Sequence, residues 1–238
     1  MNKAVVLGAG GGLGGALVRR LAADGGQTEV VALSRRRPPD LPAGVSWLYA
    51  DLDDETSLAA AAQASARDGP PDLVLVATGR LHGHGLSPEK SWKALEAEAL
   101  VAAFRANAVG PALAAKHFLP LLPRDRRAVF AALSARVGSI GDNQLGGWYG
   151  YRAAKAALNQ FIRTLAVELA RQKPLAICAA LHPGTVDTAL SAPFQARTPA
   201  EKLFAPDLAA ERLLAVVDSL TPAQSGGFFA WDGSTIPW

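Results

Sequence analysis

Short, almost continuously apolar segments recur along the chain, and a longer segment of helical periodicity follows most of them. The apolar segments are predicted strands at residues 4–7, 29–33, 46–49, 73–77, 128–133, 175–181 and 227–230. The segments between them predict helices at residues 13–23, 55–66, 92–106, 111–121, 151–171 and 205–219. Strands that are apolar on both faces fit a parallel sheet covered from both sides, whereas half-exposed antiparallel strands would alternate. Right-handed crossovers then predict an α/β, Rossmann-type fold: a doubly wound parallel sheet of about seven strands with helices on both faces.

The length of 238 residues fits a single domain over residues 1–238, since we find neither an internal repeat nor a low-complexity linker. Half of the residues are hydrophobic and 19% are charged, which indicates a packed globular protein. Two segments rich in Pro and Gly, residues 37–44 and 191–199, are predicted surface loops. The second follows a strand end, where α/β sheets bind ligands, so it is equally a candidate substrate lid.

Composition argues against several classes of partner. The net charge of +3 is small, and the short arginine clusters lack interleaved aromatic residues, so we expect no nucleic-acid partner. No run of about 18 apolar residues predicts a membrane span. The single cysteine, Cys178, lies in an apolar strand and cannot form an intrachain disulfide. We therefore expect a cytoplasmic protein that does not bind membranes.

Glycines fill the turn between the first predicted strand and the first predicted helix. Gly8, Gly10, Gly12 and Gly14 permit a tight turn and a close approach to a pyrophosphate, whose charge the helix N-terminus would meet. Leu13 lies in the same turn, at the start of the helix. Such turns also serve purely structural roles, but the order strand, turn and helix favours dinucleotide binding.

The ends of the next two predicted strands indicate which dinucleotide binds. An NAD site usually presents an acidic residue to the ribose after the second strand. This chain has Ser34 and Arg35 there, followed by two more arginines. A guanidinium forms paired hydrogen bonds with a phosphate, so we predict NADP(H) as the preferred cofactor, with NAD(H) or a merely solvated basic turn as alternatives. Asp51 and Leu52, after the third strand, are candidates for contacts with the adenine, although an Asp at a helix start is often only a cap.

Tyr151 and Lys155 are four residues apart in a segment of strong helical character, so both side chains lie on one helix face. A tyrosine can pass a proton to or from a carbonyl or alcohol oxygen while a hydride moves at the carbon. A nearby ammonium favours the phenolate form. This spacing is common, and it gains meaning from its place after the fifth strand of a chain that begins with a glycine turn.

These residues belong to a longer pattern. The pattern runs in order through Gly8, Gly12 and Gly14, then Asn107, then Tyr151-x-x-x-Lys155, then Pro183-Gly184-x-Val186-x-Thr188. With this combination, nearly the whole chain resembles the short-chain dehydrogenase/reductase family. Shorter motifs at residues 138–140, 146–149, 155–159, 181–184 and 236–238 resemble its C-factor and sniffer-type carbonyl reductase branch.

The resemblance implies a role for each of these residues. Tyr151 would be the general acid/base, and Lys155 would hold the nicotinamide ribose and lower the pKa of the tyrosine. Asn107 would anchor a water in a proton relay through Lys155, or else be a local helix kink. The backbone near Val186 and the hydroxyl of Thr188 would orient the nicotinamide carboxamide, although Thr188 is also a candidate cap.

Three departures from the family pattern limit this transfer. Leu7 stands where the family usually has a threonine, just before the first glycine of the turn. Residues 76–79 replace the usual Asn-Asn-Ala-Gly, so Gly79 keeps the turn beside the cofactor without the bracing amides. Ala135 occupies the position of the catalytic serine. Its neighbour Ser134 and the later Ser139 are both candidates to replace that serine, and side-chain alternation slightly favours Ser139.

Two functions are compatible with this sequence. The first is an NAD(P)-dependent oxidoreductase that transfers a hydride between the nicotinamide and a small carbonyl or alcohol substrate, most simply an NADPH-dependent carbonyl reductase. The alternative, motivated by Ala135 and the likeness to C-factor, is a dinucleotide-binding regulatory protein with weak or lost catalysis. The resemblance also implies a homodimer or homotetramer.

The predicted substrate pocket is walled by residues 81–86, 141–148 and 189–197. Trp148 and Phe194 in these segments favour an apolar or aromatic ligand. His82 and His84 are further candidates for contact with it, although loop histidines are more often solvated. No second cluster of His, Asp or Glu accompanies that pair, so we predict no metal site.

Overall fold

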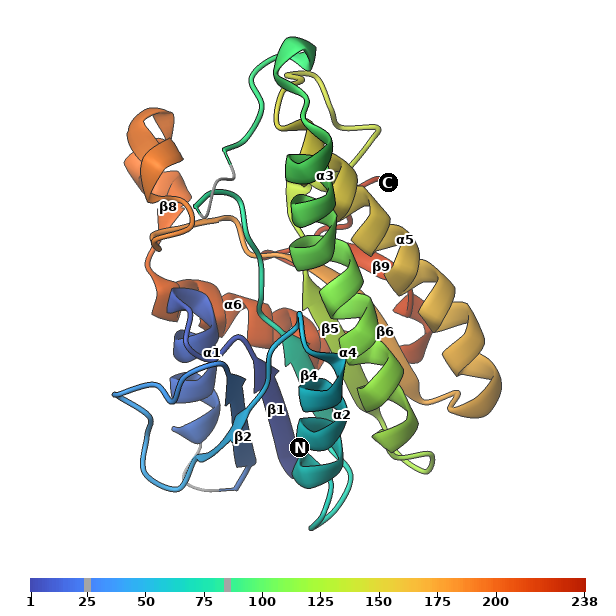
Figure 1. Cartoon of the computed structure of the whole chain (residues 1–238). Helices are drawn as coiled ribbons and strands as arrows, with labels where there is room; N and C mark the ends of the chain where they lie inside the picture. Colours follow the sequence, from blue (N-terminus) through green and yellow to red (C-terminus); the bar gives the residue numbers. More distant parts are fainter. Residues whose placement is uncertain (24–26, 84–86) are drawn as a thin grey trace.

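The computed structural model describes residues 1–23, 27–83 and 87–238. Its centre is a parallel sheet in the order β3-β2-β1-β4-β5-β6-β9 (Figure 1). The strands are β1 (Lys3–Leu7), β2 (Glu29–Ser34), β3 (Ser46–Tyr49), β4 (Leu73–Val76), β5 (Ala128–Leu133), β6 (Ala176–His182) and β9 (Gly227–Ala230). From β1 the strand order runs outward to β2 and β3 on one side, and from β4 it runs outward to β5, β6 and β9 on the other. The sheet is therefore doubly wound, and the predicted fold class is confirmed.

Helices cover both faces of this sheet. They are α1 (Gly12–Ala22), α2 (Glu55–Ser65), α3 (Ala97–Phe104), α4 (Gly110–Phe118), α5 (Tyr149–Gln172) and α6 (Pro206–Ser219). Leu17 of α1 and Leu213 of α6 pack in one core with Val6 of β1. The other core joins Phe118 of α4, together with residues of α2 and α5, to Val5. Neighbouring residues of β1 thus serve opposite cores, which is why the strand is apolar throughout.

The helix predicted at residues 92–106 begins later in the structure than the sequence pattern indicated. Trp92–Ala94 forms a separate 3-10 turn, and α3 begins only at Ala97, because Glu96 has extended backbone angles. Trp92 is 62% exposed, so its apolar character marks no buried helix face. At the other end, α3 continues through a π-helical turn, Arg105–Val109, into α4. Asn107 lies in this turn and is fully buried.

The chain after β6 leaves the main sheet and returns to it. Strand β7 (Thr185–Val186) pairs with β8 (Leu203–Phe204) in a small second sheet. This pairing brings together the two ends of residues 187–202, which we call the closing loop. The predicted surface loop at residues 191–199 lies within it and contains a 3-10 helix, Ala192–Arg197. In Figure 1 the closing loop stands above the carboxyl ends of the strands, at the upper left. Among the described residues, no helix is long and apolar enough to cross a bilayer.

Candidate active site

The glycine turn between β1 and α1 has no room for side chains at two positions. A Cβ atom at Gly14 would lie 2.1 Å from the carbonyl oxygen of Gly8. Gly8 itself has a φ of +89°, and a Cβ there would lie 2.7 Å from the carbonyl oxygen of Ala77. The turn therefore requires glycine, and it brings the N-terminus of α1 against the end of β4. Leu13 is buried in the first turn of the helix.

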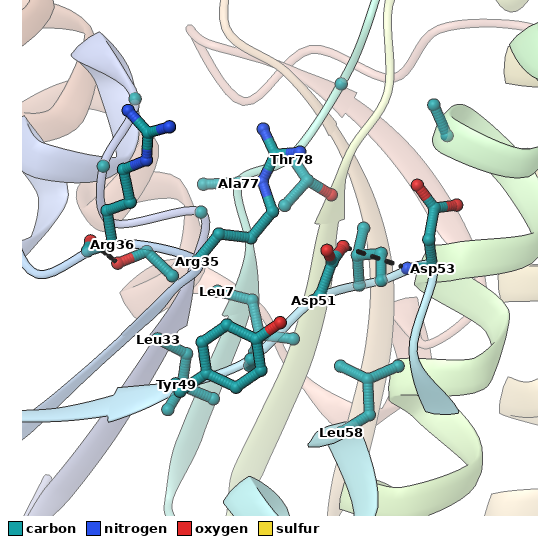
Figure 2. A pocket seen from close by; sticks show the side chains of 18 of the residues that line it. Leu7, Leu33, Arg35, Arg36, Tyr49, Asp51, Asp53, Leu58, Ala77 and Thr78 are labelled. Carbon is teal, nitrogen blue, oxygen red and sulfur yellow. Dashed lines mark hydrogen bonds between the residues drawn. The ribbon is translucent and has the colours of Figure 1, made fainter. Parts of the chain in front are cut away.

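A cavity of about 890 Å³ opens where the carboxyl ends of β1, β2, β3 and β4 meet. Its lining includes seven residues predicted from the sequence: Gly8, Gly10, Ser34, Arg35, Asp51, Leu52 and Gly79. The prediction missed four others with polar groups or an aromatic ring: Tyr49, Asp53, Thr78 and Arg80. Figure 2 shows Tyr49, Asp51 and Asp53 around one side of this cavity. These seven of the predicted dinucleotide contacts thus lie at one site.

Arg35 gives the cavity a positive edge. In Figure 2 its side chain reaches across the cavity from the end of β2, whereas Arg36 points to another side. Ser34 braces this turn, because its hydroxyl donates to the carbonyl oxygen of Arg36 at 2.7 Å. The same Oγ atom accepts a hydrogen bond from Nε1 of Trp47 at 3.0 Å. Ser34 is therefore occupied in holding the backbone that presents Arg35.

Two further groups fit a bound polar ligand. The hydroxyl of Thr78 lines the cavity and is buried without a hydrogen-bond partner, although buried polar groups are normally satisfied. The carboxylate of Asp51 accepts from the backbone amide of Asp53 at 3.1 Å, while Ser57 holds the Asp51 amide at 2.9 Å. A ligand with hydroxyl or amine groups would complete the partners of Thr78 and Asp51. The cavity therefore suits the adenosine half of a dinucleotide.

Helix α5 places Tyr151 and Lys155 on one face, as predicted. The Nζ atom of Lys155 lies 5.7 Å from the centre of the Tyr151 ring and donates to the carbonyl oxygen of Leu133 at 2.7 Å. Lys155 is 2% exposed, and burial lowers the pKa of its ammonium from 10.5 to about 7. Burial also raises the pKa of the Tyr151 phenol above its usual value.

This shift in the tyrosine pKa is opposite to the one that the family resemblance implied. Burial removes water from the Tyr151 hydroxyl, which disfavours the charged phenolate. Burial also lowers the pKa of the neighbouring Lys155, so its positive charge stabilises the phenolate less. Tyr151 in this structure is consequently a protonated phenol, able to donate a hydrogen bond and a proton.

Asn107 and Gly79 connect this pair to the cavity. The Oδ1 atom of Asn107 accepts from the Arg80 amide at 3.0 Å, and its Nδ2 atom donates to the carbonyl oxygens of Arg80 and Ala103 at 2.8 and 3.0 Å. A Cβ atom at Gly79 would lie 3.4 Å from Oδ1 of Asn107 and 3.7 Å from Nζ of Lys155. Gly79 therefore lines the cavity on one side and approaches Lys155 on the other.

The two serine candidates are both engaged elsewhere. The hydroxyl of Ser134 donates to Oδ1 of Asn159 at 2.6 Å, on the α5 face of the sheet. Ser139 is 1% exposed, and its Oγ accepts from the Asp142 amide at 3.2 Å. Ala135 follows β5 with extended backbone angles and contributes no hydroxyl. Both serines remain predictions, and their hydrogen bonds point to structural roles.

The segment from Pro183 to Thr188 packs against the glycine turn. A Cβ atom at Gly12 would lie 2.8 Å from Cγ2 of Thr188. Gly184 has a φ of +78°, and a Cβ there would collide with the ring of Phe204 at 2.6 Å. The carbonyl oxygen of Val186 accepts from the Ser191 hydroxyl, which ties the segment to the closing loop. Gly12 and Thr188 thus lie against each other, and neither they nor Val186 line the cavity at the strand ends.

Aromatic residues from three segments gather beside Tyr151. The Trp148 ring lies 6.3 Å from the Tyr151 ring and 5.1 Å from that of Phe194, both in edge-to-face arrangements. Phe194 also contacts His82 at 5.8 Å, and Nε2 of His82 lies 3.0 Å from the carbonyl oxygen of Ala189. The predicted pocket walls therefore meet at these residues. His84, the other histidine candidate, lies outside the described residues.

Glu89 is a buried residue of this region that sequence reasoning missed. Its carboxylate is held at the N-terminus of α5, where Oε2 accepts from the Gly150 amide at 3.1 Å. Its backbone carbonyl accepts from the amide of Trp148. The residue is 7% exposed. An acidic residue 61 positions before its partner carries no local signal, so only the three-dimensional structure reveals the contact.

Comparison with known proteins shows which family has this sequence and this fold. The model of the short chain dehydrogenase family matches residues 2–199. The C-signal protein of Myxococcus xanthus is 36% identical over 135 residues, which cover 57% of this chain and 76% of that protein. The carbonyl reductase Sniffer of D. melanogaster has the same fold, with a TM-score of 0.86 and 24% identity over 100% of both chains. The NADPH-bound carbonyl reductase from chicken fatty liver has a TM-score of 0.84 and 22% identity, over 100% of this chain and 99% of that one. The chain therefore belongs to the short chain dehydrogenase family and is an oxidoreductase.

Proposed function

We propose that this oxidoreductase uses NADPH to reduce a small carbonyl compound to an alcohol. The observation that carries the proposal is the pair of Tyr151 and buried Lys155, whose Nζ atom lies 5.7 Å from the centre of the tyrosine ring, joined through Gly79 to a cavity edged by Arg35. Reduction of a carbonyl needs a proton donor for its oxygen, and oxidation of an alcohol needs a base. Tyr151 is protonated at neutral pH and can supply the proton that the first reaction needs.

The chain has a suitable residue for each part of the cofactor. Gly8, Gly10, Gly12, Leu13 and Gly14 form the turn that would receive the pyrophosphate. Asp51, Leu52 and Thr78 would surround the adenine and its ribose, and Ser34 would hold Arg35 toward a 2′-phosphate. Pro183, Gly184, Val186 and Thr188 would border the nicotinamide. The absence of an acidic residue at the end of β2 supports NADP(H) over NAD(H).

The residues around Tyr151 would perform the proton chemistry. NADPH, when bound, would supply a hydride for the carbonyl carbon. The Tyr151 hydroxyl donates a hydrogen bond to the carbonyl oxygen and then its proton, which leaves an alcohol. Lys155 would hold the ribose and, through a water anchored by Asn107, would pass a proton from solvent back to Tyr151. Ala135 removes one hydroxyl from the family's usual set, so Tyr151 carries the polarisation of the carbonyl largely alone.

Two relatives support this reading of the site. Sniffer is a carbonyl reductase, and the chicken liver protein is a carbonyl reductase with bound NADPH. Both cover the full length of this chain. Their likeness supports the fold, and the residues on this chain support the chemistry.

The second candidate is a dinucleotide-binding regulatory protein with little catalysis. The loss of the serine at Ala135 and the 36% identity to C-signal favour it. It predicts cofactor binding without turnover, whereas the reductase predicts both. The presence of Tyr151, Lys155 and Asn107 together makes the reductase our proposal.

A homodimer or homotetramer stays a prediction for this chain. Exposed apolar side chains on α3 and α5, including Val101, Phe104 and Phe161, are consistent with further burial in an assembly. Analytical ultracentrifugation would decide the state.

The reductase proposal is tested in two steps. Fluorescence titration with NADPH and NADH measures cofactor binding, and the absorbance of NADPH then follows turnover with aromatic aldehydes, diketones and quinones. Oxidation of NADPH that depends on the carbonyl compound supports the reductase. Tight binding without turnover across the panel supports the regulatory protein, and failure to bind either cofactor contradicts both.

A further inference from the structure

The backbone at Trp148 adopts a conformation that bulky residues rarely take. Its φ is 52° and its ψ is 42°, in the left-handed region. Among the described residues, it is the one non-glycine residue with a positive φ. The two preceding residues, Gly146 and Gly147, have φ values of 64° and 65°. Glycine is unstrained in this region and a residue with a Cβ is not, so a tryptophan here indicates a role for its side chain.

Contacts from two sides hold this strained backbone in place. The carbonyl of buried Glu89 accepts from the Trp148 amide, and the Glu89 carboxylate accepts from the Gly150 amide. The guanidinium of Arg152 donates from Nε to the Gly147 carbonyl at 2.9 Å. The carbonyl of Trp148 accepts from the Arg152 amide at 2.8 Å. The indole is therefore directed by a fixed backbone rather than by a free loop.

The indole stands between Tyr151 and the closing loop. Its edge-to-face contacts with Tyr151 and Phe194, at 6.3 and 5.1 Å, bridge the start of α5 to residues 187–202. His82 contacts Phe194 edge-to-face, and its Nε2 atom lies 3.0 Å from the carbonyl oxygen of Ala189 in the same loop. Trp148 and Phe194 are half-buried, so each keeps ring surface open for a ligand.

We propose that Trp148 and Phe194 form an aromatic wall of the substrate site, which selects carbonyl groups attached to a flat, conjugated ring. The inference rests on the proposed reductase function, since the position of the wall matters only if Tyr151 protonates the carbonyl oxygen. A flat ring packs edge-to-face or offset-stacked against Trp148 and Phe194. A saturated ring of the same carbon number is puckered and offers no π-face. Trp148 is thus a specificity-determining residue.

The test compares two aldehydes that differ in the ring alone, benzaldehyde and cyclohexanecarbaldehyde, with NADPH as the reductant. The wild-type protein should have the higher kcat/KM with benzaldehyde. Trp148→Gly and Phe194→Ala should each lower the ratio of the two kcat/KM values by about 2- to 10-fold, which is the range for an aromatic pair. Trp148→Phe should retain most of the preference. Phe161→Ala, which removes a 41% exposed aromatic ring elsewhere on α5, is the matched control and should leave the ratio unchanged.

Thermal unfolding separates specificity from structural damage. Trp148→Gly should still unfold in one cooperative transition, because glycine adopts the positive φ without strain and the hydrogen bonds of this backbone are kept. An unchanged aldehyde ratio in both Trp148→Gly and Phe194→Ala, with turnover retained, would overturn the aromatic wall and leave the reductase intact.

A different result would separate the two proposals. If the wild type reduces neither these aldehydes nor any diketone or quinone of the panel, the reductase fails, and the wall is judged by calorimetric binding of benzyl alcohol and cyclohexylmethanol to the NADP-loaded protein. Preference for benzyl alcohol that is lost in Trp148→Gly then supports the wall, and equal binding overturns it.

Discussion

The Nζ atom of Lys155 lies 5.7 Å from the centre of the Tyr151 ring and donates a hydrogen bond to the carbonyl oxygen of Leu133. Burial raises the pKa of Tyr151 and lowers the pKa of Lys155 to about 7, so both groups tend toward their neutral forms. The pair thus presents a phenol that holds its proton at neutral pH. This arrangement suits a site that protonates a substrate oxygen.

The lowered pKa of Lys155 predicts how stability depends on pH. The unfolded chain binds this proton with a pKa near 10.5 and the folded chain with a pKa of about 7. Between these values the unfolded state binds more protons, so the free energy of unfolding rises with pH, by at most about 1.4 kcal/mol per unit. Lys155→Met should lack this contribution. Urea unfolding of both proteins without cofactor, at several pH values from 7 to 10, measures it, and parallel curves would contradict the predicted burial.

Arg35 should determine the choice of cofactor. Replacing Arg35 by Ser should weaken NADPH binding by about 10- to 100-fold, since a hydrogen bond to a charged group contributes about 1.5–3 kcal/mol. NADH binding should change little, because NADH lacks the 2′-phosphate. Arg37→Ser is a matched control, since Arg37 does not line the cavity. An equal decrease in affinity for NADPH and NADH in the Arg35 variant would show that Arg35 does not recognise the 2′-phosphate and acts only through its positive charge.

Ala135 predicts a gain of function. A serine at this position would add a hydroxyl at the end of β5, where the family has its serine. Losing one such donor costs about 100-fold or more in kcat, so Ala135→Ser should raise kcat for carbonyl reduction by up to about 100-fold. Steady-state kinetics measures the change. If Ser139→Ala instead abolishes turnover while Ala135→Ser has no effect, Ser139 already supplies the hydroxyl despite its burial.

Much of the fold could be predicted from the sequence, because each strand of a buried parallel sheet is apolar on both faces. Residues 128–133 and 227–230 match β5 and β9 in full. The helix predicted from Trp92 failed because an exposed tryptophan imitates a buried one in the periodic pattern. The prediction also placed the glycine turn, Arg35 and Asp51 together, since the carboxyl ends of parallel strands meet at one edge of the sheet.

The contacts that shape the substrate side could not be predicted. The walls at residues 81–86 and 189–197 were predicted, but the hydrogen bond between His82 and Ala189, which are 107 positions apart, has no signal in either segment. Glu89 resembles any surface carboxylate in the sequence, yet it is buried against the start of α5. The commitment of Ser134 to Asn159 depends likewise on which face of β5 meets α5. Such contacts arise from tertiary packing rather than from local pattern.

The most direct test of the central claim is the rate of NADPH oxidation on addition of benzaldehyde, in the wild type and in Tyr151→Phe. The variant keeps the ring and its contact with Trp148 but lacks the proton donor. We predict carbonyl-dependent oxidation in the wild type, a decrease of about 100-fold or more in the variant, and unchanged NADPH binding in both. Equal rates in the two proteins, or no oxidation in the wild type with any carbonyl compound despite tight NADPH binding, would contradict the reductase function of Tyr151.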